Sequence, residues 1–254
     1  MEKQPQFPAE EVMLPSKGLL YPKDSPLSKG VIEMKYMTAR EEDILTNANY
    51  IKNGTAIDKL IESLSVTEFN HDDLLIGDKN AIMLAARILG YGPEYIIKRN
   101  HPETGNEEEA TIDLSKIKDK NLDPKIIKDG KNEFSFTLPT SKIVVTFKFL
   151  TQEDENKIEK EVEGLKKINA KASEALVRLN HAILSINGDY DTKSIRDFIN
   201  NNLLARDARA FRNYNSKIQP GVDMSADVEF KDGYVESNVF FPISLNFFWP
   251  DAGI

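Results

Sequence analysis

Hydrophobic and polar residues alternate along some stretches of the chain and recur with helical spacing along others. A period of two is typical of half-buried strands, whereas apolar residues at i, i+3 and i+4 are typical of amphipathic helices. The alternation predicts strands at 31–37, 94–100, 110–114, 133–138, 142–150, 226–231 and 235–243. The helical spacing predicts helices at 39–50, 55–65, 79–89, 152–187, 194–201 and 208–214. This mixture predicts an α+β fold. In the longest helix, Gly164 is a candidate break, and the expected buried side consists of Leu176, Leu179, Ile183 and Leu184.

Two leucines, two spacer residues and an aspartate occur twice, each time before a helical pattern. The first copy runs from Leu74 to Asp78 and the second from Leu203 to Asp207. A carboxylate at a helix start can accept from the free N–H groups of the first turn, so Asp78 and Asp207 are predicted N-caps. The leucine pair before each cap can fold back onto the helix as a hydrophobic staple.

The elements around this motif also recur, which predicts an internal duplication. Each predicted half holds a strand, an acidic helix, further helices, the motif and a β-hairpin. The predicted organisation is an extended N-terminal arm at 1–30, a first α+β repeat at 31–117, a linker at 118–132, and a second α+β repeat at 133–254 that ends in an aromatic segment. Two long repeats favour pseudo-twofold packing over a solenoid, which needs three or more units.

Both ends of the chain carry apolar residues where a free tail would be polar. The arm contains five prolines and is expected to be extended, yet residues 13–22 are markedly apolar. One interpretation is that both ends bind partner proteins through Leu14, Leu19, Leu20, Tyr21, Phe247, Phe248 and Trp249. The other is that the arm lines a groove on its own domain and that the aromatic segment plugs the core. Both stay open at this point.

Composition excludes several classes of function. The chain has 254 residues, a formal net charge of −8 and no cysteine. Disulfides, thiolate catalysis and cysteine zinc sites are therefore absent, and the acidic balance gives no support to a nucleic-acid partner. No apolar stretch approaches the length of a membrane span, and the first 30 residues lack a signal-peptide pattern. A protein that stays in the cytosol after synthesis is expected.

Candidate chemistry is sparse. His71, His101 and His181 have no spacing that suggests metal ligands, and the acidic stretches 107–109 and 153–155 are typical of solvated turns and first helical turns. Phosphate-binding loops, dinucleotide loops, HExxH and GxSxG motifs are all missing. We therefore predict no catalytic, cofactor-binding or metal-binding residues, no small-molecule substrate and no enzymatic activity.

The turns of two predicted hairpins have the frame of a zinc knuckle of the form Cys-Pro-x-Cys-Gly, but without the thiols. These are residues 101–105 (HPETG) and 229–233 (EFKDG). A structural zinc ion would contribute about 10–16 kcal/mol to folding. We predict that no zinc is bound and that strand pairing and packing hold these hairpins instead.

Several short motifs together resemble the baseplate hub family of T4-like, contractile-tailed bacteriophages. They are LPSKGLLYP at 14–22, KYMTAREEDIL at 35–45, LLIGDKNAIMLAARILGYG at 74–92, LLARDARAFR at 203–212 and FFWP at 247–250. Members of that family often carry Cys-x-x-Cys-Gly knuckles at both hairpins, and this sequence departs from them there. The resemblance leaves the architecture intact but puts a metal role in doubt.

The resemblance implies a structural or assembly component of the tail baseplate that acts through contacts with other tail proteins and performs no catalysis. It implies a location in the host cytoplasm during assembly and in the tail baseplate of the virion. Whether the protein stays in the virion or acts as an assembly chaperone is left open. Two alternatives are a tail-associated hydrolase that uses carboxylates, with Glu153 and Glu155 as the obvious candidates, and a degenerate zinc-ribbon binder of nucleic acid.

Overall fold

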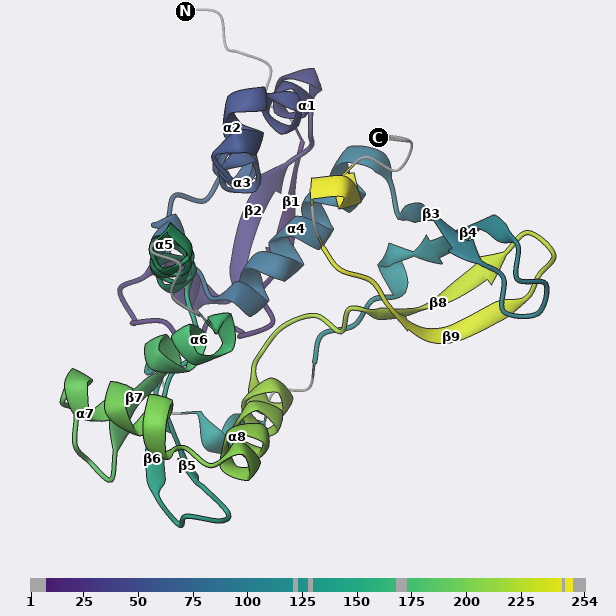
Figure 1. Ribbon diagram of the computed structural model, residues 1–254. Coiled ribbons are helices and arrows are strands. Elements are labelled where there is room, and N and C mark those ends of the chain that lie inside the picture. The colour runs from purple at the N-terminus through teal and green to yellow at the C-terminus, as the bar shows by residue number, and fades with distance from the viewer. Residues whose placement is uncertain (1–7, 121–122, 128–129, 168–172, 244, 249–254) are drawn as a thin grey trace, which may run out of the picture.

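The structure is a computed structural model that describes residues 8–120, 123–127, 130–167, 173–243 and 245–248 (Figure 1). Its helices are α1 (Ala39–Thr46), α2 (Ala48–Lys52), α3 (Ala56–Leu64), α4 (Ile76–Tyr91), α5 (Gln152–Lys167), α6 (Glu174–Ala182), α7 (Thr192–Asp197) and α8 (Ala205–Ile218). Its strands are β1 (Ala9–Met13), β2 (Val31–Lys35), β3 (Glu94–Asn100), β4 (Glu107–Asp113), β5 (Phe134–Thr137), β6 (Val144–Phe147), β7 (Ile183–Ile186), β8 (Ser225–Phe230) and β9 (Val235–Phe240). The fold is α+β.

The strands form three antiparallel sheets, and one of them joins the two halves of the chain. The sheet orders are β1-β2, β5-β6-β7 and β3-β4-β8-β9. The four-stranded sheet combines a hairpin from each half, because β4 pairs with β8 through Ala110 opposite Phe230 and Ile112 opposite Val228. In Figure 1 this sheet extends to one side of the helices. The halves therefore share a sheet, which sequence periodicity does not reveal.

The N-terminal region differs from the extended arm that its prolines predict. Residues 9–13 form β1, which pairs with β2 from Ala9 opposite Lys35 to Met13 opposite Val31. Beyond β1, the backbone turns at Ser16–Gly18 and passes through a short 3-10 helix, Pro26–Lys29. The described prolines Pro8, Pro15, Pro22 and Pro26 lie outside the paired residues, so they do not interrupt the ladder.

The predicted helix over 152–187 is also wrong in its last part. The helix α6 ends at Ala182, and residues 183–186 form β7, which pairs with β6. The apolar residues there satisfy a strand against β6 as well as they satisfy a helix, and periodicity over four residues cannot separate the two. Of the expected buried side, Leu179 and Ile183 are buried, whereas Leu176 and Leu184 are only half-buried.

The helix α4 crosses the middle of the molecule, between α1–α3 and the part that contains α6 and α8 (Figure 1). Its side chains are buried all around the helix: Gly77, Asp78, Ala81, Ile82, Met83, Leu84, Ala86 and Arg87. The backbone at Gly77 meets the linker between α8 and β8, where a Cβ atom would lie 1.8 Å from the Pro220 carbonyl oxygen. Only a residue without a side chain permits this contact.

The two motif aspartates are not N-caps. The caps are Leu75 and Leu204, with no side-chain hydrogen bond, and each aspartate is the third residue of its helix. Asp78 instead accepts hydrogen bonds from the Ser16 N–H (2.9 Å), the Ser16 hydroxyl (2.6 Å) and the Tyr21 hydroxyl (2.6 Å). Asp207 accepts from the N–H groups of Thr140 (2.7 Å) and Ser141 (2.9 Å). Each carboxylate holds a distant loop rather than its own first turn, which sequence-local reasoning cannot show.

The Asp78 contact is buried and contains no cation. Asp78 has no exposed area, and burial raises the pKa of its carboxyl group. Burial and the neighbouring Asp78 raise the pKa of the Tyr21 phenol. The phenol therefore keeps its proton and donates a hydrogen bond to the Asp78 carboxylate. The same phenol oxygen accepts from the Leu75 N–H at the start of α4. Residues 14–21 are thus fastened to α4 by a fully paired polar network.

The start of each acidic helix is fixed by a second recurring contact. Thr38 caps α1 in a capping box with Glu41, whose carboxylate also binds the Lys35 ammonium at 2.8 Å. Before α5, the Thr151 N–H donates to Asp154, which binds the Lys148 ammonium at 2.7 Å. Glu41 is buried; burial favours its neutral form, but donors from Lys35, Thr38 and Ser63 outweigh it and lower its pKa to about 2.

Replacing Gly77 with alanine is expected to destabilise the protein by at least about 1–3 kcal/mol, because the new methyl group overlaps the Pro220 backbone. The matched control is Gly164→Ala in α5, where a Cβ meets nothing within 4 Å. That change should stabilise by about 0.5–1 kcal/mol, since alanine is the better helix former. Urea unfolding of both variants measures the difference, and equal effects would contradict the close contact.

Asp78→Ala should cost about 3–5 kcal/mol, because it leaves three buried donors without an acceptor. Asp207→Ala should cost less, since its two donors belong to a loop that water can reach. Chemical denaturation gives both values. Similar losses for the two variants would argue against a special role for the Asp78 network.

Glu41→Gln should lower the free energy of unfolding at pH 7 by about 1–2 kcal/mol, because an ionised acceptor of several hydrogen bonds is lost. The folded pKa lies below the ordinary glutamate value, so the stabilisation is present above about pH 4.5 and is lost as pH falls toward 2. Denaturation curves of both proteins between pH 7 and pH 2 should therefore converge on acidification. A gap that stays constant would contradict the ionised role of Glu41.

Candidate interaction surfaces

The residues predicted to bind partners at the two ends pack inside the chain itself. Leu14, Leu20, Tyr21, Phe247 and Phe248 are each at most 4% exposed. Leu19 is half-buried, and Trp249 lies outside the described residues. In this conformation the five buried side chains offer a partner no surface, and the core interpretation of both ends describes their packing. Their role in partner binding stays a prediction.

The C-terminal aromatic segment is tied to α4 by a buried arginine. The Arg87 side chain donates from Nε to the Phe247 carbonyl oxygen at 3.1 Å, and from its other nitrogens to the carbonyls of Gly92 and Glu94. The Phe247 ring packs edge-on against Tyr95, with centroids 5.0 Å apart. Hydrogen bonds from a charged donor are strong, so the Arg87 guanidinium links the described C-terminal segment to α4 and to the residues that follow α4.

Three of the acidic residues considered for acid–base chemistry are occupied in ion pairs. Glu153 pairs with Lys157 at 2.7 Å and Glu155 with Arg178 at 2.6 Å. Glu109 pairs with Lys231 across the four-stranded sheet at 2.6 Å. The structure does not bring Glu153 and Glu155 to opposite sides of a cleft, as glycoside hydrolysis requires.

The two knuckle-like turns do come together at the end of the four-stranded sheet. The His101 ring is buried and lies against Phe230 and Tyr234, with centroid distances of 4.6 and 4.9 Å. Its Nδ1 accepts from the N–H groups of Glu103 and Thr104, so the proton belongs on Nε2, which faces the Asp232 carboxylate at 3.3 Å. A histidine ring thus fills the space between the turns.

No metal-binding arrangement accompanies this histidine. Within the described ranges, no three His, Asp or Glu side chains gather closely enough to hold a metal ion. His71 stacks on Phe69, and burial lowers its pKa; His181 contacts Glu161 at 2.9 Å. The three histidines therefore serve separate local contacts.

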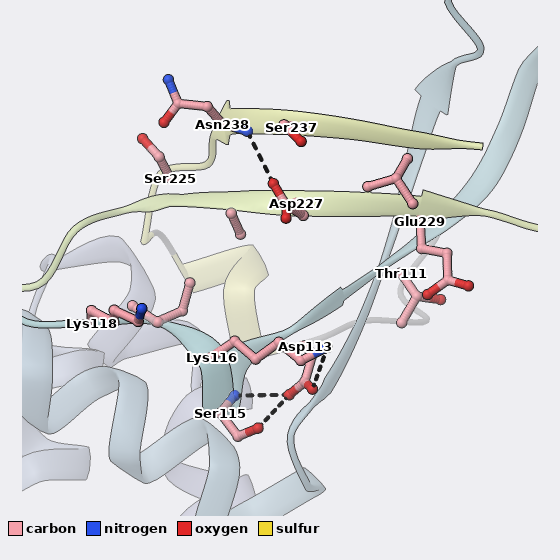
Figure 2. A pocket seen from close by; sticks show the side chains of 13 residues that line it. Thr111, Asp113, Ser115, Lys116, Lys118, Ser225, Asp227, Glu229, Ser237 and Asn238 are labelled. Atoms are coloured by element: carbon pink, nitrogen blue, oxygen red, sulfur yellow. Dashed lines mark hydrogen bonds and ion pairs between the residues drawn. The ribbon is translucent and has the colours of Figure 1, made fainter. Parts of the chain in front are cut away.

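The open face of the four-stranded sheet carries a groove of about 700 Å³ (Figure 2). The opposite face packs on the core through Ala110, Ile112, Val228, Phe230 and Val239, all buried. Polar residues of β4, β8 and β9 and of the segment after β4 line the groove. They are Thr111, Asp113, Ser115, Lys116, Lys118, Ser225, Asp227, Glu229, Ser237 and Asn238.

The Asp113 carboxylate in the groove is held in its ionised form. Hydrogen bonds from the Ser115 hydroxyl and N–H, together with Lys116, hold the pKa of Asp113 below its usual range. A general acid needs the opposite shift, which comes from an apolar and enclosed setting. This carboxylate is therefore better suited to binding than to proton transfer.

Apolar side chains stand on the same open face. Phe240 is 70% exposed, Val235 is 48% exposed and Ile96 is 40% exposed. A bulge in β9 at Ser237–Asn238, with Asn238 at φ +60°, sets the register so that Val239 and Phe241 point inward and Phe240 outward. Phe240 was not among the predicted partner-binding residues, which lie further along the chain at Phe247, Phe248 and Trp249. Strict alternation through 239–241 would have separated it.

No helix among the described residues is long and apolar enough to cross a membrane. Neither the search of curated proteins nor the search of solved structures finds a match to the chain. A family model described as "T4 bacteriophage base plate protein" matches residues 20–248. That match spans both halves, the shared sheet, α4 and the described C-terminal segment. The chain therefore belongs to the T4 bacteriophage base plate protein family and is a structural component of the phage tail baseplate.

Proposed function

We propose that this protein is a hub component or hub-assembly factor of the baseplate and that it acts by contacts with other tail proteins. The family match supports a place in the baseplate, and the motif resemblance supports the hub. The proposed contact surface is the open face of the four-stranded sheet. It combines a polar groove with three exposed apolar side chains, whereas Leu14, Leu20, Tyr21, Phe247 and Phe248 near the chain ends are buried.

The composition of this face fits a protein partner. Interfaces between proteins place aromatic and aliphatic residues at the centre and polar groups at the rim. Phe240, Val235 and Ile96 supply apolar anchors, and the groove's carboxylates and lysines supply the rim. A partner that covers Phe240 removes a large aromatic ring from water, which favours association.

Phe240→Asp combined with Val235→Asp is expected to reduce incorporation of the chain into tails about tenfold or more, since a charge at the centre of an interface is costly. The matched control is Tyr190→Asp, which replaces another exposed aromatic residue (63%) in the turn between β7 and α7. The measurement is the amount of tagged full-length chain in purified tails from infected cells, by quantitative mass spectrometry.

Wild-type protein absent from tails and from their assembly intermediates would overturn the proposed function. Full incorporation of the double variant would overturn the sheet face as its contact surface. Chain found in intermediates but not in finished virions would identify an assembly factor.

A further inference from the structure

The helix α8 presents a row of arginines to solvent. Arg206, Arg209 and Arg212 are all exposed and spaced at i, i+3 and i+6, which places them along one side of the helix. Their opposite side is the buried one, with Ala208, Phe211 and Ile218 in the core. These three residues are called the α8 arginine face below.

Within the described part of the chain, none of these three guanidinium groups makes an ion pair or a side-chain hydrogen bond. Other arginines do find acids: Arg99 pairs with Glu236 and Arg178 with Glu155. The chain as a whole carries a net charge of −8, so acids are abundant. Three adjacent arginines without acids of their own are therefore available to an external anionic group.

The corresponding positions on α4 are covered. Counted from the motif aspartates, Arg206, Arg209 and Arg212 correspond to Gly77, Asn80 and Met83. Gly77 and Met83 are buried and Asn80 is half-buried.

On α4, a segment of the same chain provides the cover, since the Pro220–Gly221 backbone lies directly on Gly77. On α8 the side is open, and Leu204 before it is 48% exposed whereas its counterpart Leu75 is 2% exposed. The side of α4 that corresponds to the α8 arginine face therefore packs against the same chain, whereas this side of α8 is exposed.

We propose that the α8 arginine face binds an acidic surface of a neighbouring protein in the baseplate. The proposal rests on the proposed function, because it names the chemistry of one of its partners. Arginine forms two parallel hydrogen bonds with a carboxylate, so a row of three suits an acidic helix or loop. Exposed Leu204 adds an apolar contact at the start of the same helix.

Two other occupants fit less well. A nucleic acid would meet a molecule of net charge −8, which disfavours approach of a polyanion. A second copy related by a twofold axis through this face would bring arginines against arginines. A different protein with clustered carboxylates avoids both costs.

The test uses baseplates purified from an infection that lacks this protein, to which full-length chain is added back. The variant is Arg206→Glu with Arg209→Glu and Arg212→Glu, and binding should fall at least tenfold. The charge-matched control reverses Lys52, Lys131 and Lys193 to glutamate, which are exposed on other parts of the surface, and should bind like wild type. Replacing the three arginines with lysine keeps the charge but removes the paired hydrogen bonds, so binding should lie between that of wild type and that of the reversal variant. Wild-type binding should weaken with added salt. The electrostatic screening length is about 10 Å at 0.1 M and shortens as the salt concentration rises.

Binding of the reversal variant at the wild-type level overturns the α8 arginine face and leaves the proposed function intact. Equal losses in the reversal variant and its control overturn it as well, since the effect is then one of net charge. Wild-type chain that does not bind these baseplates at all overturns the proposed function. Self-association in sedimentation, or binding to a DNA duplex in anisotropy titration, that the reversal abolishes would assign the face to those occupants instead. Thermal unfolding checks that each variant folds.

Discussion

The rest of the structure depends on the central position of α4, which has buried residues on every side, and on the hydrogen bonds that its buried polar side chains require. Asp78 holds the N-terminal segment through Ser16 and Tyr21, and Arg87 holds the C-terminal segment through the Phe247 carbonyl. Gly77 admits the linker from the second half at backbone distance. A buried charge without partners costs several kcal/mol, so these segments and α4 stabilise one another. Within the described residues, Leu14, Leu20, Tyr21, Phe247 and Phe248 are therefore parts of the core.

The N-terminal and C-terminal halves of the chain are joined by shared strand pairing. Their hairpins form one sheet through β4 and β8, and Leu75 before α4 bridges to Thr151 before α5. Matching contacts recur in both halves: Lys35–Glu41 and Lys148–Asp154, Asp78 on Ser16 and Asp207 on Thr140. These pairs support an internal duplication, which stays a proposal. Under this proposal, divergence of the two copies accounts for a central α4 and for an α8 with exposed arginines.

Sequence patterns predict most of the helices and strands of this chain. They fail for features that depend on contacts between segments distant in the sequence. Alternation and helical spacing locate most strands and helices, and the leucine motif lies at the starts of α4 and α8, although both helices begin three residues before the predicted positions 79 and 208. The role of Asp78 could not be predicted, because its donors lie more than fifty residues away. The open position of Phe240 depends on a bulge, and the strand β7 depends on the neighbouring β6. Which surfaces the fold leaves uncovered depends on contacts between distant segments, so apolar content alone does not locate Phe240 or the open side of α8.

The central claim is that this chain closes its core with its own ends and contacts other tail proteins through the open sheet face and the α8 arginine face. A density map of an assembled baseplate that contains the protein tests this directly. The account predicts that Leu14, Tyr21 and Phe247 remain packed around α4 while neighbouring subunits cover Phe240 and the arginines of α8. Density that shows the two ends drawn out into neighbouring subunits, with those faces bare, would contradict it.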